Sequence, residues 1–175
     1  MKPFIVLIFL SLSITALCQD LSNLDNKMGF NKFKLESSYD LYKSQLNYRL
    51  TGQDKVIYYD YNGNDINSVF NVFVKRINLG FYKNMLYTIS IDFITVDKED
   101  ETILQNELQE LFGRQRISYN SSSSIGEYDW AMQWESKNVI LQLDKISCNN
   151  NSNPCEVELF MLSKKLKIEI KNVSF

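Results

Sequence analysis

The 175 residues of the sequence include no histidine. This absence excludes nucleophile systems that depend on an imidazole base, and it removes the commonest ligand of transition metals. The glycine-rich phosphate-binding signatures GxxxxGK[ST] and GxGxxG are also missing. A carboxylate pair or a lysine-activated serine is all that remains for catalysis. We therefore expect no metal, no cofactor and no enzymatic activity.

Proline and glycine are scarce as well, with two and six residues, which argues against a disordered or fibrous chain. The net charge is −2 and no long basic run occurs, so the electrostatic signature of a nucleic-acid-binding protein is absent. No second apolar run approaches the roughly 20 residues that a membrane-spanning helix needs. The composition, 45% hydrophobic and 13% aromatic, instead predicts a sizeable buried core.

The N-terminal segment has the organisation of a secretory signal peptide. Lys2 precedes an apolar run over residues 4–17, and polar residues follow. We expect residues 1–18 to be removed by cleavage before Gln19, giving an exported protein that is periplasmic or secreted. The alternative is an outer-membrane lipoprotein anchored at Cys18, although Leu17 stands where a small residue is usual.

The two remaining cysteines, Cys148 and Cys155, close the segment CNNNSNPC. In an exported protein such a pair most simply forms a disulfide. Two cysteines without histidine leave a zinc site half empty, and a redox pair would be separated by two residues instead of six. We predict a disulfide between Cys148 and Cys155.

About 157 residues remain after cleavage, enough for one domain. We expect a flexible leader over residues 19–28 and a single domain over residues 29–175. Apolar residues at helical spacing predict helices near residues 38–49 and 97–112. Asp97 is the expected cap of the second helix.

Most of the remaining sequence alternates between apolar and polar residues, which predicts strands. Residues 69–96 should form a hairpin that turns at Lys83 and Asn84. Further strands are expected over residues 128–135, 138–146, 156–162 and 165–172. The predicted fold class is α+β, a twisted antiparallel sheet of about six to eight strands with two helices packed on one face.

The segments GFNKFKLESSYDLYKSQL and LGFYKNMLYTISIDF, the helix ending in LFG and the tryptophan-bearing strand resemble small exported bacterial domains of the Bacteroidetes type. A more distant similarity is to the domains of outer-membrane assembly lipoproteins and of the β-lactamase inhibitor protein. Glu36 stands where those domains usually carry glycine. The resemblance implies recognition or scaffolding work in the envelope, without shared catalytic residues.

Tyrosines occur on both sides of the strand expected near residues 56–61. We expect the helix-covered face to claim Val56 and Tyr58. Tyr59 and Tyr61 are then the candidate binding residues, because tyrosine is enriched where a few residues dominate an interface.

Other patterns have structural explanations that we favour. The segment 60–65, DYNGND, has oxygen ligands for calcium but lacks the glycine and glutamate of an EF-hand, so a turn explains it better. The acids of residues 97–101 match a helix start. The alternating face of Trp130, Met132 and Trp134 is more often core than a stacking platform. A strip of lysines over residues 164–171 would protect an edge strand.

These observations favour a non-catalytic exported protein that binds a protein partner, as an inhibitor, immunity factor or assembly accessory. A glycan- or lipid-binding domain is the alternative, and a carboxylate-based hydrolase ranks last.

Overall fold

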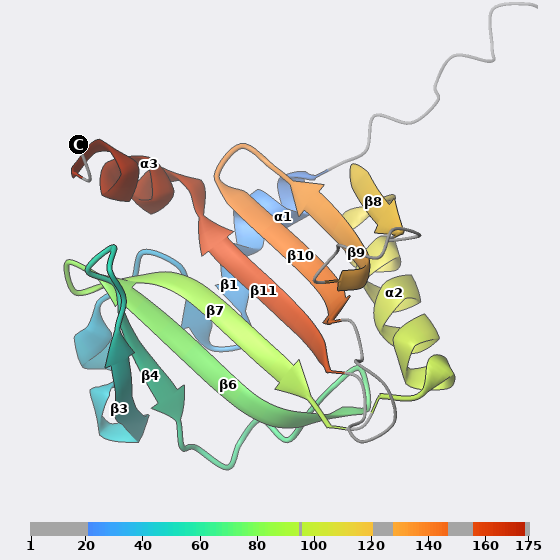
Figure 1. Ribbon diagram of the computed structural model, residues 1–175, viewed down its shortest axis with the longest axis horizontal. Helices are drawn as coiled ribbons and strands as arrows, with labels where there is room; N and C mark the ends of the chain where they lie inside the picture. The colour runs from blue at the N-terminus through green and yellow to red at the C-terminus, as the bar shows by residue number, and fades with distance from the viewer. Residues whose placement is uncertain (1–20, 95, 121–127, 147–155, 174–175) are drawn as a thin grey trace, which may run out of the picture.

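A computed structural model describes residues 21–94, 96–120, 128–146 and 156–173. The fold is α+β, built on a twisted, open antiparallel sheet with helices against it (Figure 1). The predicted fold class is therefore confirmed.

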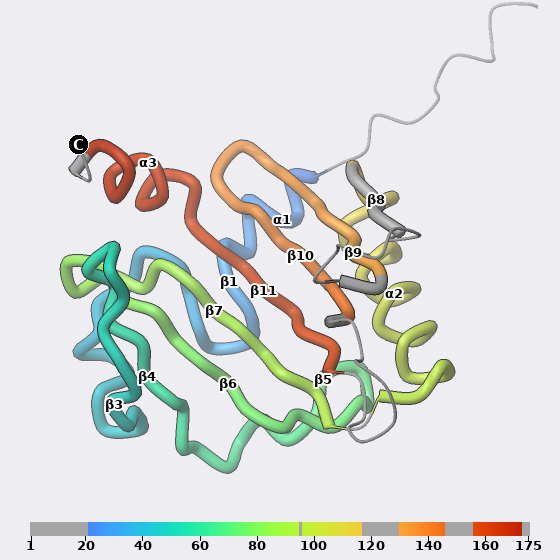
Figure 2. Tube along the Cα trace, in the orientation of Figure 1, coloured from blue at the N-terminus to red at the C-terminus, as the bar shows by residue number. Residues whose placement is uncertain are grey.

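The sheet consists of eight strands, all paired antiparallel. Their spatial order is β3 (Leu46–Thr51), β4 (Ile57–Tyr61), β6 (Val72–Tyr82), β7 (Met85–Phe93), β11 (Val157–Ser163), β10 (Val139–Ile146), β9 (Tyr128–Glu135) and β8 (Ile117–Asn120). The short β5 (Ser68–Val69), labelled in Figure 2, pairs with β6. A separate hairpin joins β1 (Gly29–Phe30) to β2 (Phe33–Lys34). Among the described strands, β3 and β8 are thus the edges of the main sheet.

The hairpin of β6 and β7 forms the centre of the sheet and turns at Lys83 and Asn84, as predicted. Both residues have left-handed backbones, with φ of 48° and 66°. Two consecutive residues of this kind match the twist of antiparallel strands.

One face of the sheet, the covered face, packs against α1 (Ser22–Lys27) and α2 (Lys98–Phe112). The predicted cap of α2 is confirmed, because the Asp97 carboxylate accepts hydrogen bonds from the backbone N–H groups of Glu99 and Asp100 at 2.8 and 2.9 Å. The apolar stripe of α2 is buried with Trp134 in the main core. The tryptophan strand therefore faces the core, as its alternation predicted.

Residues 22–27, which we expected to belong to a flexible leader, form α1. Leu24 is completely buried. The carboxylate of Asp25 accepts hydrogen bonds from the Ser136 hydroxyl at 2.7 Å and from the Asn138 backbone at 2.8 Å. These contacts tie α1 to the turn between β9 and β10, so the folded domain begins before residue 29.

The helix predicted near residues 38–49 is wrong. Two short 3-10 helices, η1 (Tyr39–Leu41) and η2 (Lys43–Gln45), lead instead into β3. The Ser38 hydroxyl caps η1 by accepting a hydrogen bond from the Asp40 backbone N–H at 3.2 Å. A short isolated helix is marginal in water, and pairing with β4 gives the same residues a ladder of hydrogen bonds.

The strand predicted over residues 165–172 is also wrong, because this segment belongs to α3 (Lys164–Val173). Leu166 and Ile170, one helical turn apart, are buried on the opposite face of the sheet, which we call the open face. The Ser163 hydroxyl accepts a hydrogen bond from the Leu166 backbone at 3.3 Å and starts the helix. The lysine strip therefore lies on a helix and guards no edge strand.

Candidate functional site

Tyr59 and Tyr61, the predicted binding residues, lie on the covered face and are half-buried against the main core. Val56 and Tyr58 share the other face, where they cluster with α3. The face opposite them, however, is the one that α1 and α2 cover. Tyr59 and Tyr61 therefore contribute to packing, whatever else they do.

The ring of Tyr61 lies 5.0 Å, centroid to centroid, from Phe33 in the β1–β2 hairpin. Its hydroxyl accepts a hydrogen bond from Lys32 and donates one to Asp65. The Lys32 ammonium also pairs with Asp65 at 2.8 Å. Tyr61 thus joins the hairpin to the loop after β4.

Tyr59 belongs to an aromatic cluster that reaches the solvent at the β3 edge. Its ring centroid lies 5.1 Å from that of Tyr39, 5.8 Å from Phe81 and 6.1 Å from Tyr48. Tyr48 is 65% exposed, and Leu41 at the end of η1 is 70% exposed. The exposed Tyr48 ring therefore lies next to Tyr59, the predicted binding residue.

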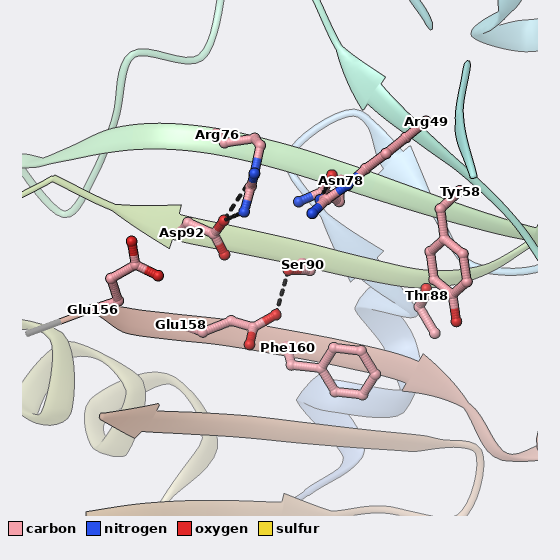
Figure 3. Close-up of a pocket in the computed structure, with 10 residues that line it drawn as sticks. All are labelled: Arg49, Tyr58, Arg76, Asn78, Thr88, Ser90, Asp92, Glu156, Glu158 and Phe160. Carbon is pink, nitrogen blue, oxygen red and sulfur yellow. Dashed lines mark hydrogen bonds and ion pairs between the residues drawn. The ribbon is translucent and has the colours of Figure 1, made fainter. Parts of the chain in front are cut away.

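The open face is hollowed into a basin of about 270 Å³ (Figure 3). Strands β3, β4, β6, β7 and β11 contribute to it, together with Glu156 just before β11. Its lining consists of Arg49, Tyr58, Arg76, Asn78, Thr88, Ser90, Asp92, Glu156, Glu158 and Phe160. The rings of Tyr58 and Phe160 lie at one end and Glu156 at the other. The basin thus combines two aromatic surfaces with planar polar groups.

The two arginines of the basin are held by neighbours. The Arg76 guanidinium donates two hydrogen bonds to Oδ2 of Asp92, one of them from Nε at 2.9 Å. The Arg49 guanidinium reaches across from the edge strand and donates to the Asn78 side-chain oxygen at 2.7 Å. These bonds fix the donors in place before any ligand arrives.

Three acids stand directly opposite one another on neighbouring strands of the open face: Asp92 on β7, Glu158 on β11 and Asp144 on β10. Arg76 compensates the first of them. The Ser90 hydroxyl donates to Glu158, yet burial raises the pKa of the Glu158 carboxyl, and the negative charge of Asp92 adds to the effect. The row therefore has a deficit of positive charge.

Asp144, at the far end of this row, is 2% exposed. Its Oδ2 accepts a hydrogen bond from the Gln142 amide at 2.7 Å, whereas no group in the described part of the chain donates a hydrogen bond to Oδ1. Burial raises the pKa of Asp144 to about 6, and the charges of Glu158 and Asp92 act in the same direction. A buried carboxyl in this position opposes folding at neutral pH.

Gly80 makes room for the aromatic end of the basin. A β-carbon at this position would lie 2.4 Å from the Thr88 hydroxyl oxygen and 2.9 Å from the ring of Tyr58. Burial raises the pKa of Tyr58, with a smaller contribution from the charge of Asp54. The missing side chain of Gly80 thus allows the Tyr58 ring to lie against β6.

The sequence reasoning missed the basin because its residues come from five strands whose order it did not predict. The sequence did contain part of the pattern that indicates the basin, since Ser90 and Asp92 alternate with the apolar residues of β7. Glu158 and Phe160 alternate in the same way on β11. Only the adjacency of β7 and β11 brings the two sets together.

The signal peptide, Cys18 and the predicted Cys148–Cys155 disulfide lie outside the described residues. Within the described ranges, no group of three or more acids or cysteines is arranged to hold a metal ion. The same ranges contain no helix with the length and apolarity needed to cross a membrane.

No family model, curated protein or solved structure matches the chain. Function must therefore be inferred from the geometry of the described surfaces. Cationic groups suit the basin chemically, because they would offset its acids. Hydroxyl groups suit it as well, because its planar polar side chains can form hydrogen bonds with them.

Proposed function

We propose that this is an exported, non-catalytic protein that binds a partner protein through the β3 end of its sheet. The observation that carries the proposal is the exposed edge strand β3. It presents Tyr48 on one side, next to Tyr59, and Arg49 on the other side, next to the basin. Tyrosine and arginine are the residue types that most often dominate binding energy at protein interfaces.

The backbone of β3 supports the same reading. The strand pairs with β4 on one side and is the last strand of the sheet on the other. Such an edge can accept a further strand from a partner, with backbone hydrogen bonds giving affinity and side-chain pockets giving specificity. Leu50, 44% exposed, adds apolar surface on the side of Tyr58.

The basin next to β3 would receive a side chain of the partner. Glu156, which pairs with Lys75, and Glu158 line it, and the row Arg76, Asp92, Glu158 and Asp144 has three acids and one cation. A lysine or arginine of the partner, packed against the Phe160 ring, would offset this deficit. The basin therefore favours a partner with a basic anchor residue.

The cellular location is part of the proposal and depends on the sequence of residues 1–18. Cleavage before Gln19 would give a periplasmic or secreted protein, and acylation of Cys18 would give an outer-membrane lipoprotein. Intact-mass measurement of the protein from its native host distinguishes the two.

The proposal is tested by affinity capture from envelope extract with immobilised residues 19–175. The Tyr48→Ala/Arg49→Ala variant should lose at least about 2 kcal/mol of binding to the captured protein, by the usual magnitude of interface hot spots. Phe73→Ala is the matched control, because Phe73 is 68% exposed on β6 and lines no part of the basin. Equal binding by the double variant and the wild type would exclude the β3 end as the site.

A second candidate is a saccharide-binding protein, which the shape of the open face favours. The basin is concave, and the Tyr58 and Phe160 rings could stack on the apolar face of a sugar ring while Asn78 and Asp92 bind its hydroxyl groups. A glycan array probed with wild type and Phe160→Ala tests this function. Turnover of a bound glycan would instead indicate a hydrolase with Asp92 and Glu158 as its acid pair.

A further inference from the structure

A second cavity, of about 140 Å³, lies on the covered face between the sheet and the elements packed on it. Its apolar lining comes from the β1–β2 and β5–β6 hairpins, from α2 and from the strands β10 and β11. The main contributors are Phe30, Phe70, Leu108, Leu111, Phe112 and Met161. The cavity is separate from the basin and plays no part in the proposed function.

The volume matches a small apolar group. An apolar cavity of about 150 Å³ in a protein core stays dry and binds benzene. Two exposed residues, Lys27 and Asn31, also line the cavity, so it has a mouth at the surface. A benzene-sized group can therefore enter from solvent.

The charge at the mouth is positive. Lys27 is the single charged residue in the described lining. Its ammonium lies 5.6 Å from the centroid of the Phe112 ring, and in the described part of the chain no carboxylate lies within ion-pair distance of it. An unpaired cation beside an apolar cavity complements a ligand with an apolar body and a negative end.

The backbone at Phe70 provides an independent indication. Phe70 and Asn71 form the two-residue turn between β5 and β6, with φ of 51° and 67°. Asparagine suits this left-handed conformation, whereas a bulky residue such as phenylalanine adopts it rarely. The turn thus keeps a strained residue whose ring lines the cavity, and such strain concentrates at functional sites.

We propose that this cavity binds a small aromatic or branched aliphatic carboxylate of about the size of benzoate. The apolar body would lie among Phe30, Phe70, Leu111 and Met161. The carboxylate would pair with Lys27 and would accept a hydrogen bond from the side-chain amide of Asn31, which also lines the cavity.

Isothermal titration of the chain of residues 19–175 with benzoate tests the proposal, with benzylamine as the ligand of opposite charge. Benzoate should bind and raise the melting temperature, and benzylamine should bind at least tenfold more weakly. Lys27→Gln, at an exposed position, should weaken benzoate binding at least fivefold without changing the melting temperature of the free protein. Equal affinity for the two ligands, or unchanged affinity in Lys27→Gln, would overturn the carboxylate assignment.

Two further variants locate the ligand. Leu111→Trp fills the cavity from a half-exposed position of α2 and should abolish binding, whereas Ile103→Trp, half-buried on the same helix but outside the lining, should not. Phe70→Asn suits the turn better and removes the ring, so it should fold and bind benzoate several-fold more weakly. Benzoate binding that survives Leu111→Trp, or no binding by the wild type, would exclude the cavity as a site.

Discussion

The two faces of the sheet are built from the same strands and have opposite chemistry. On β7, Ile89 and Ile91 enter the main core, whereas Ser90 and Asp92, one residue further along, line the basin. The covered face buries apolar surface, which stabilises the fold. The open face keeps acids whose pKa values are raised, and no described group donates a hydrogen bond to Oδ1 of Asp144. These groups do not stabilise the fold. Groups that oppose folding are expected where function requires them, so the comparison favours the basin of the open face as part of the proposed binding surface at the β3 end.

The largest expected effect is on the covered face. Leu108→Ala should lower the free energy of unfolding by roughly 2 to 5 kcal/mol, because Leu108 is fully buried in the middle of the α2 stripe. Glu107→Ala, on the exposed side of the same helix, should change it by less than about 0.5 kcal/mol. Denaturant titration measures both, and similar losses would show that α2 does not pack as described.

On the open face, removing a charge should stabilise the protein. The pKa of Asp144 is raised from 3.8 to about 6 in the folded state, so the folded chain holds this proton more tightly than the unfolded chain does. The stability contributed by the protonated Asp144 carboxyl is therefore fully present below about pH 4, and it is lost as the pH rises through about 6. Asp144→Asn should raise the free energy of unfolding at pH 7.5 by about 1 to 3 kcal/mol and have little effect at pH 4.

Denaturant titrations across this pH range check the prediction. Glu110→Gln, at an exposed position of α2, is the control and should differ from wild type by less than about 0.5 kcal/mol at every pH. A destabilised Asp144→Asn variant at pH 7.5 would mean that the carboxylate is compensated and that the contrast between the faces is overstated.

A smaller effect is expected at the ion pair of the basin. Arg76→Leu should cost about 1 to 2 kcal/mol, since it leaves the mostly buried Asp92 carboxylate without its cation. The double variant Arg76→Leu/Asp92→Leu should recover part of this loss. Thermal unfolding of these two variants and of Asp92→Leu provides the test, and additive losses would contradict a direct interaction.

Much of the covered face was predictable from the sequence. The spacing of Leu104, Leu108 and Phe112 predicted α2, and the cap at Asp97 and the hairpin turn at Lys83 are as expected. These features depend on neighbours in sequence. Helical period and turn chemistry act over a few residues, so one sequence is enough to recognise them.

The wrong predictions, the helix near residues 38–49 and the strand over residues 165–172, occur where a short apolar pattern fits both the helical and the strand period. Leu166 and Ile170 alternate with lysines, but they are also four residues apart, and the exposed Ile168 between them fits a helix. At β3 the apolar residues Leu46 and Leu50 are four apart as well, yet they belong to a strand in which a β-bulge after Tyr48 pairs Leu46 with Tyr61 and Leu50 with Tyr58, on opposite faces of the sheet. Contacts with distant residues decide such cases, and the same contacts assemble the basin.

The central claim, that partners bind at the β3 end, is tested most directly by amide hydrogen exchange on the protein with and without its captured partner. Strand addition at the edge predicts that amides of residues 46–51 exchange at least tenfold more slowly in the complex, while those of α2 keep their rates. Unchanged exchange in β3 together with new protection on α3 or at β8 would contradict the account.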